Sequence, residues 1–187
     1  MSSTNQGGRH VKGINLVGLV KLLRVYRRQR RIRGLSPGAM ALLEDRVLVS
    51  SWYPLEHHWE LLGFMYREML GSDPEHALAM GLAGGKETWK GTHRIFVSER
   101  GAISALRSMG PAWRSYFDFG ELDVDVEDEH TVRFTVRDYV DCPAAHGMTI
   151  AGWHLAAAQL AGSPKATIEV LQKPWEGAQQ QVHVVRF

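Results

Sequence analysis

The sequence predicts an α+β protein in which helices pack on one face of a four-stranded antiparallel sheet. Apolar residues recur at helical spacing through most of the chain up to about residue 117. The pattern then changes to alternation with period 2, interrupted by one further helical stretch, so the C-terminal part reads β-β-α-β-β. Helices on one face of an antiparallel sheet are the economical packing for that order.

The length and composition fit one domain. With 187 residues, of which 44% are hydrophobic and 22% charged, the chain predicts a flexible lead over residues 1–12 and a single domain over 13–187. The N-terminus lacks the features of a signal peptide, and no apolar run approaches the ~18 residues of a membrane span. The single cysteine excludes an intramolecular disulfide. We therefore expect a cytoplasmic protein.

Three helices are expected in the first part. A stripe at i, i+3, i+4 and i+7 predicts a helix from Ile14 that ends at Gly34. Ser36 suits the cap of a short helix over Pro37–Glu44. Residues 46–54 read as extended or loop, and an amphipathic helix begins at Pro54. The residues of the first stripe are Leu16, Leu19, Val20 and Leu23.

The middle of the chain predicts helices broken by glycine and proline. Ser72 and Pro74 begin a helix that Gly84-Gly85 is expected to interrupt, and residues 86–101 continue as a helix to a turn. The helix over residues 101–117 is expected to bend or break at Gly110-Pro111.

The C-terminal part predicts the sheet. Residues 121–140 read as a hairpin with its turn near Asp128-Glu129. A helix over Pro143–Leu160, a strand over 165–173, a turn at Trp175–Gly177 and a last strand over 179–187 complete the order.

Four residues near the start of the Pro143–Leu160 helix belong to types that ligate haem or soft metals. His146 and His154 are eight residues apart and share a similar face. The alternative is packing, with Gly147 and Gly152 allowing a close approach to the sheet. Packing is favoured because no second cysteine and no C-x-x-C-H motif is present, so we expect no metal and no cofactor. The four residues are Cys142, His146, Met148 and His154.

Enzymatic motifs are missing, and we expect no enzyme. The sequence has no G-x-S-x-G elbow, and residues 81–86 do not complete a P-loop. Cys142 lies at a helix start, which can lower a thiol pKa. Catalysis by Cys142 is therefore kept as a hypothesis, ranked last. His57 and Glu60 could reach one cation, but adjacent His57 and His58 point about 100° apart on a helix. A partly buried, solvated helix face is the preferred interpretation there.

A basic segment follows the first apolar stripe. Four uses compete: docking of an acidic protein, a plain solvated face, an anionic membrane and nucleic acid. An acidic protein partner ranks first, and nucleic acid is not expected because no groove-reading motif accompanies the arginines. The partner-binding candidates are Arg24, Arg27, Arg28, Arg30, Arg31 and Arg33.

Tryptophans and histidines supply candidates for a ligand pocket between helices and sheet. Aromatic residues at helical spacing are more often core, and this alternative stays open. The ligand-binding candidates are Trp59, Trp113, His146, Trp153 and His154.

A family resemblance is carried by Cys142-Pro143, the glycine-containing helix, Ala161-Gly162, the strand TIEV and the Gly177 turn. These features resemble the vinyl-reductase domain and its relatives, the haem nitric-oxide-binding domain and the TRAPP tethering subunits. Residues 45–187 also resemble a group of myxobacterial paralogues of unknown function. The resemblance implies a fold and a habit of binding ligands or partners rather than a reaction.

The sequence departs from these families at positions that matter for cofactor binding. The positions around Gln172 and Gln179 are not the cysteines that vinyl-reductase domains often carry, and the Tyr-x-Ser-x-Arg signature of the haem type is missing. The resemblance therefore argues against an inherited metal or haem site. The leading hypothesis is a non-catalytic bacterial signalling adaptor that docks a partner or forms a homodimer. The alternative is a sensor for an apolar or tetrapyrrole ligand.

Overall fold

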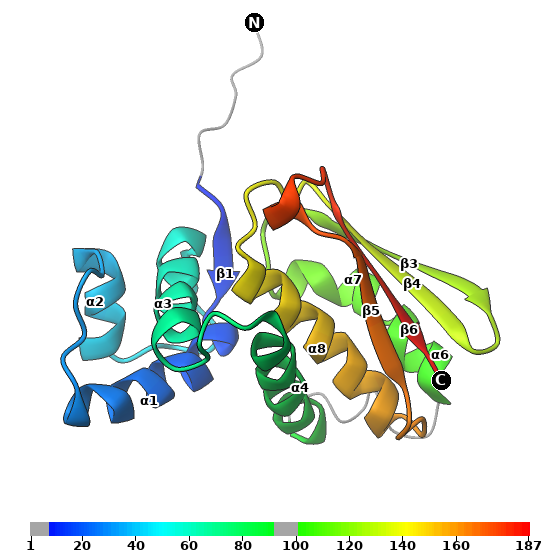
Figure 1. Ribbon diagram of the computed structural model, residues 1–187, viewed down its shortest axis with the longest axis horizontal. Coiled ribbons are helices and arrows are strands. Elements are labelled where there is room, and N and C mark those ends of the chain that lie inside the picture. The colour runs from blue at the N-terminus through cyan, green and yellow to red at the C-terminus, as the bar shows by residue number, and fades with distance from the viewer. Residues whose placement is uncertain (1–7, 92–100) are drawn as a thin grey trace, which may run out of the picture.

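The computed structural model describes residues 8–91 and 101–187 and has the predicted α+β architecture. Figure 1 shows a group of N-terminal helices on one side and the main sheet on the other, with α8 (Ala144–Leu160) and α4 (Pro74–Lys90) between them. Within the described part of the chain, every helix is too short or too polar to span a bilayer.

The N-terminal group contains α1 (Ile14–Gln29), α2 (Pro37–Glu44) and α3 (Leu55–Glu68). The predicted stripe of α1 is buried, and Ser36 caps α2 by accepting a hydrogen bond from the Ala39 N–H at 3.2 Å. The structure differs from the expected lead at residues 10–12, because β1 (His10–Lys12) pairs antiparallel with β2 (Trp52–Pro54).

The main sheet has the strand order β3-β4-β6-β5, all antiparallel. Its strands are β3 (Glu121–Asp128), β4 (Thr131–Arg137), β5 (Thr167–Gln172) and β6 (Gln181–Arg186), and the 3-10 turn η2 (Pro174–Glu176) joins the last two. Val132, Phe134 and Val136 are buried at alternate positions of β4, as period-2 patterning predicts. The predicted hairpin, its turn and the helix before β5 are confirmed.

Glycines set the contact between α4 and α8. A Cβ added to Gly81 would lie 2.1 Å from the Thr149 backbone oxygen, and one added to Gly85 would lie 2.7 Å from the Ala156 Cβ. A Cβ on Gly152 would lie 2.1 Å from the Leu78 backbone oxygen. The two backbones therefore approach more closely than side chains at these positions would allow.

Three local predictions were wrong. Gly84-Gly85 does not interrupt α4, because Gly85 faces α8 inside a continuous helix. Gly152 brings α8 against α4 rather than against the sheet. The break expected at Gly110-Pro111 lies instead at Ser108, between α6 (Gly101–Arg107) and α7 (Met109–Ala112), and the 3-10 turn η1 (Trp113–Ser115) follows. The segment 92–100, expected to continue to a turn, lies outside the described residues.

Candidate ligand-binding site

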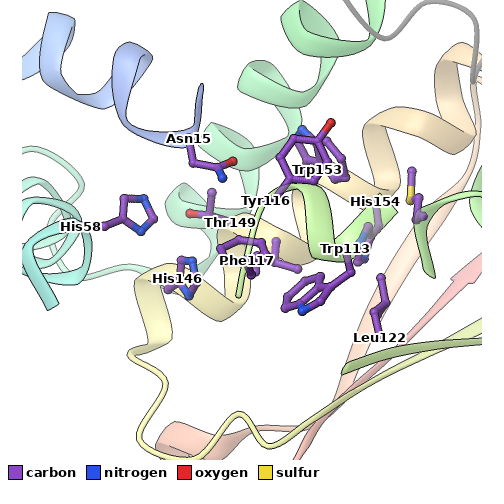
Figure 2. Close-up of a pocket in the computed structure, with 12 residues that line it drawn as sticks. Asn15, His58, Trp113, Tyr116, Phe117, Leu122, His146, Thr149, Trp153 and His154 are labelled. Atoms are coloured by element: carbon purple, nitrogen blue, oxygen red, sulfur yellow. The ribbon is translucent and has the colours of Figure 1, made fainter. Parts of the chain in front are cut away.

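A cavity of about 90 Å³ lies where α1, α3, α8, the α7–η1 segment and β3 meet (Figure 2). Most of its wall is apolar. Its aromatic lining residues are Trp113, Tyr116, Phe117 and Trp153, and its aliphatic ones are Met109, Leu122 and Ile150. Its polar lining residues are Asn15, His58, His146, Thr149 and His154.

The aromatic wall is held by the chain that follows α7. Trp113 donates its indole N–H to the Phe119 carbonyl at 2.9 Å. The Lys12 N–H donates to the Tyr116 carbonyl at 2.8 Å, and Phe117 forms an isolated bridge with Val11. This wall is therefore tied to the N-terminal strand.

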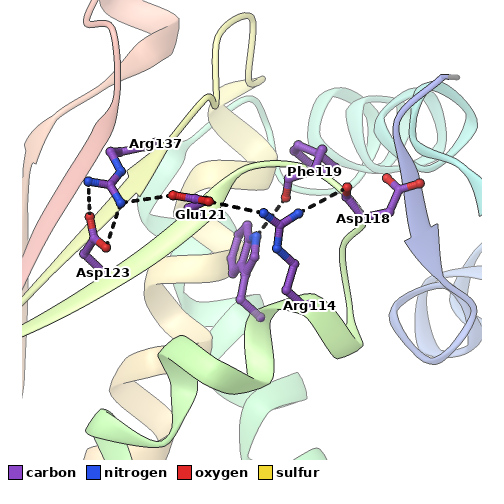
Figure 3. Close-up of polar contacts among 7 residues, drawn as sticks. Arg114, Asp118, Phe119, Glu121, Asp123 and Arg137 are labelled. Atoms are coloured by element: carbon purple, nitrogen blue, oxygen red, sulfur yellow. Dashed lines mark hydrogen bonds and ion pairs between the residues drawn. The ribbon is translucent and has the colours of Figure 1, made fainter. Parts of the chain in front are cut away.

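An exposed network of ion pairs fixes the same segment to the sheet (Figure 3). Arg114 donates to the Asp118 carbonyl and to Glu121, each at 3.4 Å. Arg137 donates to the other oxygen of Glu121 at 3.1 Å and to Asp123 at 3.0 Å. Exposed pairs of this kind stabilise a fold by only about 0–1 kcal/mol each, so we assign the network a positioning role.

His146 accepts hydrogen bonds at its Nδ1 nitrogen. The Trp59 indole N–H donates to His146 Nδ1 at 2.9 Å, and the Tyr139 hydroxyl contacts the same nitrogen. An indole nitrogen can only donate, so Nδ1 carries no hydrogen and the neutral ring carries it on Nε2. Burial, followed by the neighbouring His58 and Arg9, holds the pKa of His146 well below its usual value, so the ring stays neutral.

His154 belongs to a buried polar chain. Its Nδ1 lies 2.7 Å from His183 Nε2, and both rings stack on Phe134. The Gln181 amide nitrogen lies 3.4 Å from His183 Nδ1 and donates to the Gly147 carbonyl at 2.9 Å. If that amide donates to His183 Nδ1, His183 Nε2–H donates to His154, which then carries its hydrogen on Nε2. Burial lowers the pKa of His183 to about 3 and that of His154 well below its usual value.

His58 and Asn15 present polar atoms that have no partner. His58 is 5% exposed, and burial lowers its pKa to about 4. Within residues 8–91 and 101–187, neither His58 Nδ1 nor Asn15 Nδ2 finds a hydrogen-bond partner, and both residues line the cavity. A buried polar group left unpaired costs about 1–3 kcal/mol and calls for an explanation.

Sequence reasoning missed His58. The predicted partly buried, solvated face holds for His57 and Glu60, which are half-buried, whereas His58 is buried. Its signal was its spacing, three residues after Leu55 and four before Leu62, which places it on the buried stripe of α3. Glu60, considered with His57 as a cation site, instead accepts the Ser36 hydroxyl at 2.6 Å.

Four of the five predicted ligand-binding residues meet at the cavity, namely Trp113, His146, Trp153 and His154. Trp59 lies elsewhere. Its ring packs under the Arg9 guanidinium, 4.8 Å from the ring centre, and it reaches the cavity only through its bond to His146. The role of all five in binding stays a prediction.

Cys142 does not have the properties of a reactive thiol. It is 1% exposed, and burial raises its pKa to about 12. The expected lowering by the helix start was wrong in direction, because desolvation of the thiolate outweighs it.

The basic segment divides into two groups. Arg24 donates to the Leu43 carbonyl at 2.9 Å and also contacts the Leu42 and Asp45 carbonyls, so it closes the C-terminal end of α2. Arg27 pairs with Glu44 at 3.1 Å. The remaining four arginines, Arg28, Arg30, Arg31 and Arg33, are exposed. All of them except Arg28 lie beyond the end of α1 at Gln29 rather than on the helix. Docking of an acidic partner here stays a prediction.

Comparison with known proteins identifies the fold. No family model matches the chain, and no curated protein matches it. Among solved structures, an H-NOX protein from S. oneidensis in the Fe(II)NO ligation state is 14% identical, with a TM-score of 0.64 over 94% of this chain and 98% of that one. An Fe(II) unliganded mutant of the H-NOX protein from K. algicida is 12% identical, with a TM-score of 0.63 over 94% and 95%.

A mutant of the T. tengcongensis H-NOX is 10% identical, with a TM-score of 0.64 over 94% of this chain and 97% of that one. The expected likeness to haem nitric-oxide-binding domains is confirmed for the fold. The likeness to vinyl-reductase domains, TRAPP subunits and myxobacterial paralogues stays a prediction. The chain has the fold of H-NOX domains.

Proposed function

We propose that this chain is a non-catalytic sensor domain that binds a small molecule in the cavity between its N-terminal helices and α8. One observation carries the proposal. Two residues that line an apolar, largely aromatic cavity, Asn15 and His58, each have a buried polar atom without a partner among the described residues. Pockets with apolar walls and a few convergent polar groups are the usual form of small-molecule sites.

A haem does not fit the residues present. The cavity of about 90 Å³ is well below the roughly 300 Å³ at which pockets for drug-sized ligands begin, and a tetrapyrrole is larger still. A histidine that binds a metal normally donates a hydrogen bond from its other nitrogen. His146 does not have this arrangement. Its Nδ1 accepts a hydrogen bond from Trp59, and its Nε2 carries the hydrogen and so has no free lone pair for a metal.

The other donors support the same conclusion. His154 is hydrogen-bonded to His183 at 2.7 Å in a closed stack with Phe134. The apolar-ligand form of the sensor hypothesis is therefore preferred over the tetrapyrrole form.

Xenon binding tests the proposal, since xenon enters apolar cavities without needing polar recognition. We expect dissolved xenon to shift the indole N–H signals of Trp113 and Trp153 in nitrogen-15 NMR spectra. Leu122→Phe, which fills the cavity, should abolish the shifts. Leu171→Phe, on the exposed edge strand β5, should preserve them. If xenon leaves the wild-type signals unmoved, the cavity does not bind ligands and the proposal is wrong.

A haem titration separates the two forms of the sensor hypothesis. Adding hemin to the purified protein should give no saturable Soret band that depends on His146 or His154. A stoichiometric band that disappears in His146→Leu but persists in His130→Leu, an exposed histidine of the β3–β4 turn, would restore the tetrapyrrole form.

A further inference from the structure

We propose that the ligand is a small, neutral molecule with a hydroxyl group, held at its polar end by Asn15 and His58. This inference rests on the proposed function and specifies the ligand of the same site. Asn15 lies in the first turn of α1 and His58 in the first turn of α3, so two separate elements bring these two residues to one cavity (Figure 2).

The two polar atoms define the chemistry of that end of the ligand. An amide nitrogen only donates, so Asn15 Nδ2 requires an acceptor. An imidazole nitrogen accepts or donates according to its tautomer, so His58 Nδ1 requires a group that can do either. A hydroxyl supplies both functions, because its oxygen accepts and its hydrogen donates.

One polar atom of each of three other lining residues is already engaged. The Thr149 hydroxyl donates to the Ala145 carbonyl at 2.6 Å. His146 Nδ1 accepts from Trp59, and His154 Nδ1 is bonded to His183. Among the described lining residues, only Asn15 and His58 therefore have a buried side-chain nitrogen or oxygen without a partner.

The wall excludes charged ligands. No Asp, Glu, Lys or Arg is among the described residues that line the cavity. Its three histidines are buried, with pKa values below the usual one because burial disfavours the imidazolium. An ion placed here would lose its hydration without gaining a counter-charge, which costs far more than a hydroxyl does.

The volume limits the size of the ligand. An apolar cavity of about 150 Å³ in an engineered protein accepts benzene, a ligand of about six carbon atoms. A cavity of about 90 Å³ therefore suits a ligand of about four non-hydrogen atoms. Because even the best small ligands gain a limited affinity per atom, the Kd of such a ligand should be no tighter than about 40 µM.

The test compares 1-propanol with 1-chloropropane, which has the same carbon chain and no hydroxyl. Each is titrated into the 187-residue protein, and binding is followed by the indole signals of Trp113 and Trp153. We expect 1-propanol to bind. Asn15→Leu and His58→Phe should each raise its Kd at least about 10-fold, the loss of one hydrogen bond at about 1.4 kcal/mol, and change the Kd of 1-chloropropane less than about 2-fold. His130→Phe is the matched histidine control and should change neither.

Xenon binding, measured on the same samples, keeps the two proposals distinct. If 1-propanol fails to bind, or binds equally to wild type and Asn15→Leu while xenon still enters, the hydroxyl inference is wrong and the proposed function survives. That result would mean that water satisfies the two polar atoms. If xenon also fails to enter, both proposals are wrong. Should His58→Phe not fold, Asn15→Leu alone decides, because leucine resembles asparagine in shape and lacks its polar atoms.

Discussion

Trp59 of α3 and His146 of α8 are joined by a 2.9 Å hydrogen bond between the indole N–H and Nδ1. These residues are 87 positions apart, and the bond connects the N-terminal helices to the helix that supports the sheet. Because the indole can only donate, the bond also determines which nitrogen of His146 carries the hydrogen. One contact thus links the two halves of the fold and sets the chemistry of a cavity wall.

Removing this donor should weaken the fold modestly. Trp59→Phe keeps most of the apolar contact but leaves His146 Nδ1 with the Tyr139 hydroxyl as its remaining strong donor. We expect a loss of about 1 kcal/mol in the free energy of unfolding, measured by urea denaturation. Trp52→Phe, at a tryptophan that is 41% exposed, is the control and should change it by less than about 0.5 kcal/mol. Equal losses in both variants would contradict a role for this bond.

Acid should unfold the protein through its buried histidines. Burial lowers the pKa of His58 from 6.5 to about 4, so below pH 6.5 the unfolded chain binds a proton that the folded chain does not. Stability therefore falls as the pH drops from 6.5 to 4, by about 3 kcal/mol for His58 alone at 1.36 kcal/mol per unit. Urea denaturation at pH 7.5, 6, 5 and 4.5 measures this loss.

The variant His58→Phe isolates the contribution of that histidine. Its stability should fall less steeply between pH 6 and 4.5, by up to about 1.4 kcal/mol per pH unit, because it lacks one titrating group. His130→Phe removes an exposed histidine and is the control for the loss of a histidine side chain. An unchanged slope in His58→Phe would show that His58 is not held neutral in the folded state.

The sequence predicted the elements whose patterns are local. The stripe of α1, the Ser36 cap and the alternation of β3 and β4 each depend on residues a few positions apart. The contacts around the cavity join residues that are far apart in the sequence. His154 pairs with His183 across 29 residues, and no spacing rule indicates such a pairing.

Glycine and histidine show why the remaining features were missed. Gly85 reads as a helix breaker when only its neighbours are considered, yet its lack of a side chain is what lets α8 pack there. His58 was placed on a partly buried, solvated helix face, although its spacing from Leu55 puts it on the buried stripe. The error at Gly85 arises because a packing partner from a distant part of the chain decides what the residue does, whereas His58 could have been placed from its local spacing.

Two glycines of α4, Gly81 and Gly84, allow its contact with α8 to be tested within one helix. In Gly81→Ala the new Cβ would lie 2.1 Å from the Thr149 backbone oxygen, so α4 and α8 must separate. We expect a loss of about 3 kcal/mol or more in the free energy of unfolding. Gly84→Ala meets nothing within 4 Å and should stabilise the protein by about 0.5–1 kcal/mol, because alanine favours the helix. Effects of the same sign in thermal or urea denaturation would contradict this packing.

The arginine segment should separate into structural and dispensable residues. Arg24→Ala leaves carbonyls at the end of α2 without their donor, and we expect a loss of about 2 kcal/mol in the free energy of unfolding. A variant with Ala at positions 28, 30, 31 and 33 should stay within about 0.5 kcal/mol of wild type, since these side chains are exposed. Urea denaturation of both variants measures the difference.

That separation also makes the docking of an acidic partner testable. The variant with Ala at positions 28, 30, 31 and 33 changes the surface charge by four units while the fold stays intact, so lost binding to an acidic polypeptide such as poly-glutamate would come from the surface itself. Binding that weakens in this variant and falls with added salt would support the docking prediction. Binding lost only in Arg24→Ala would instead reflect the damaged end of α2, and the arginine segment would then be a solvated face.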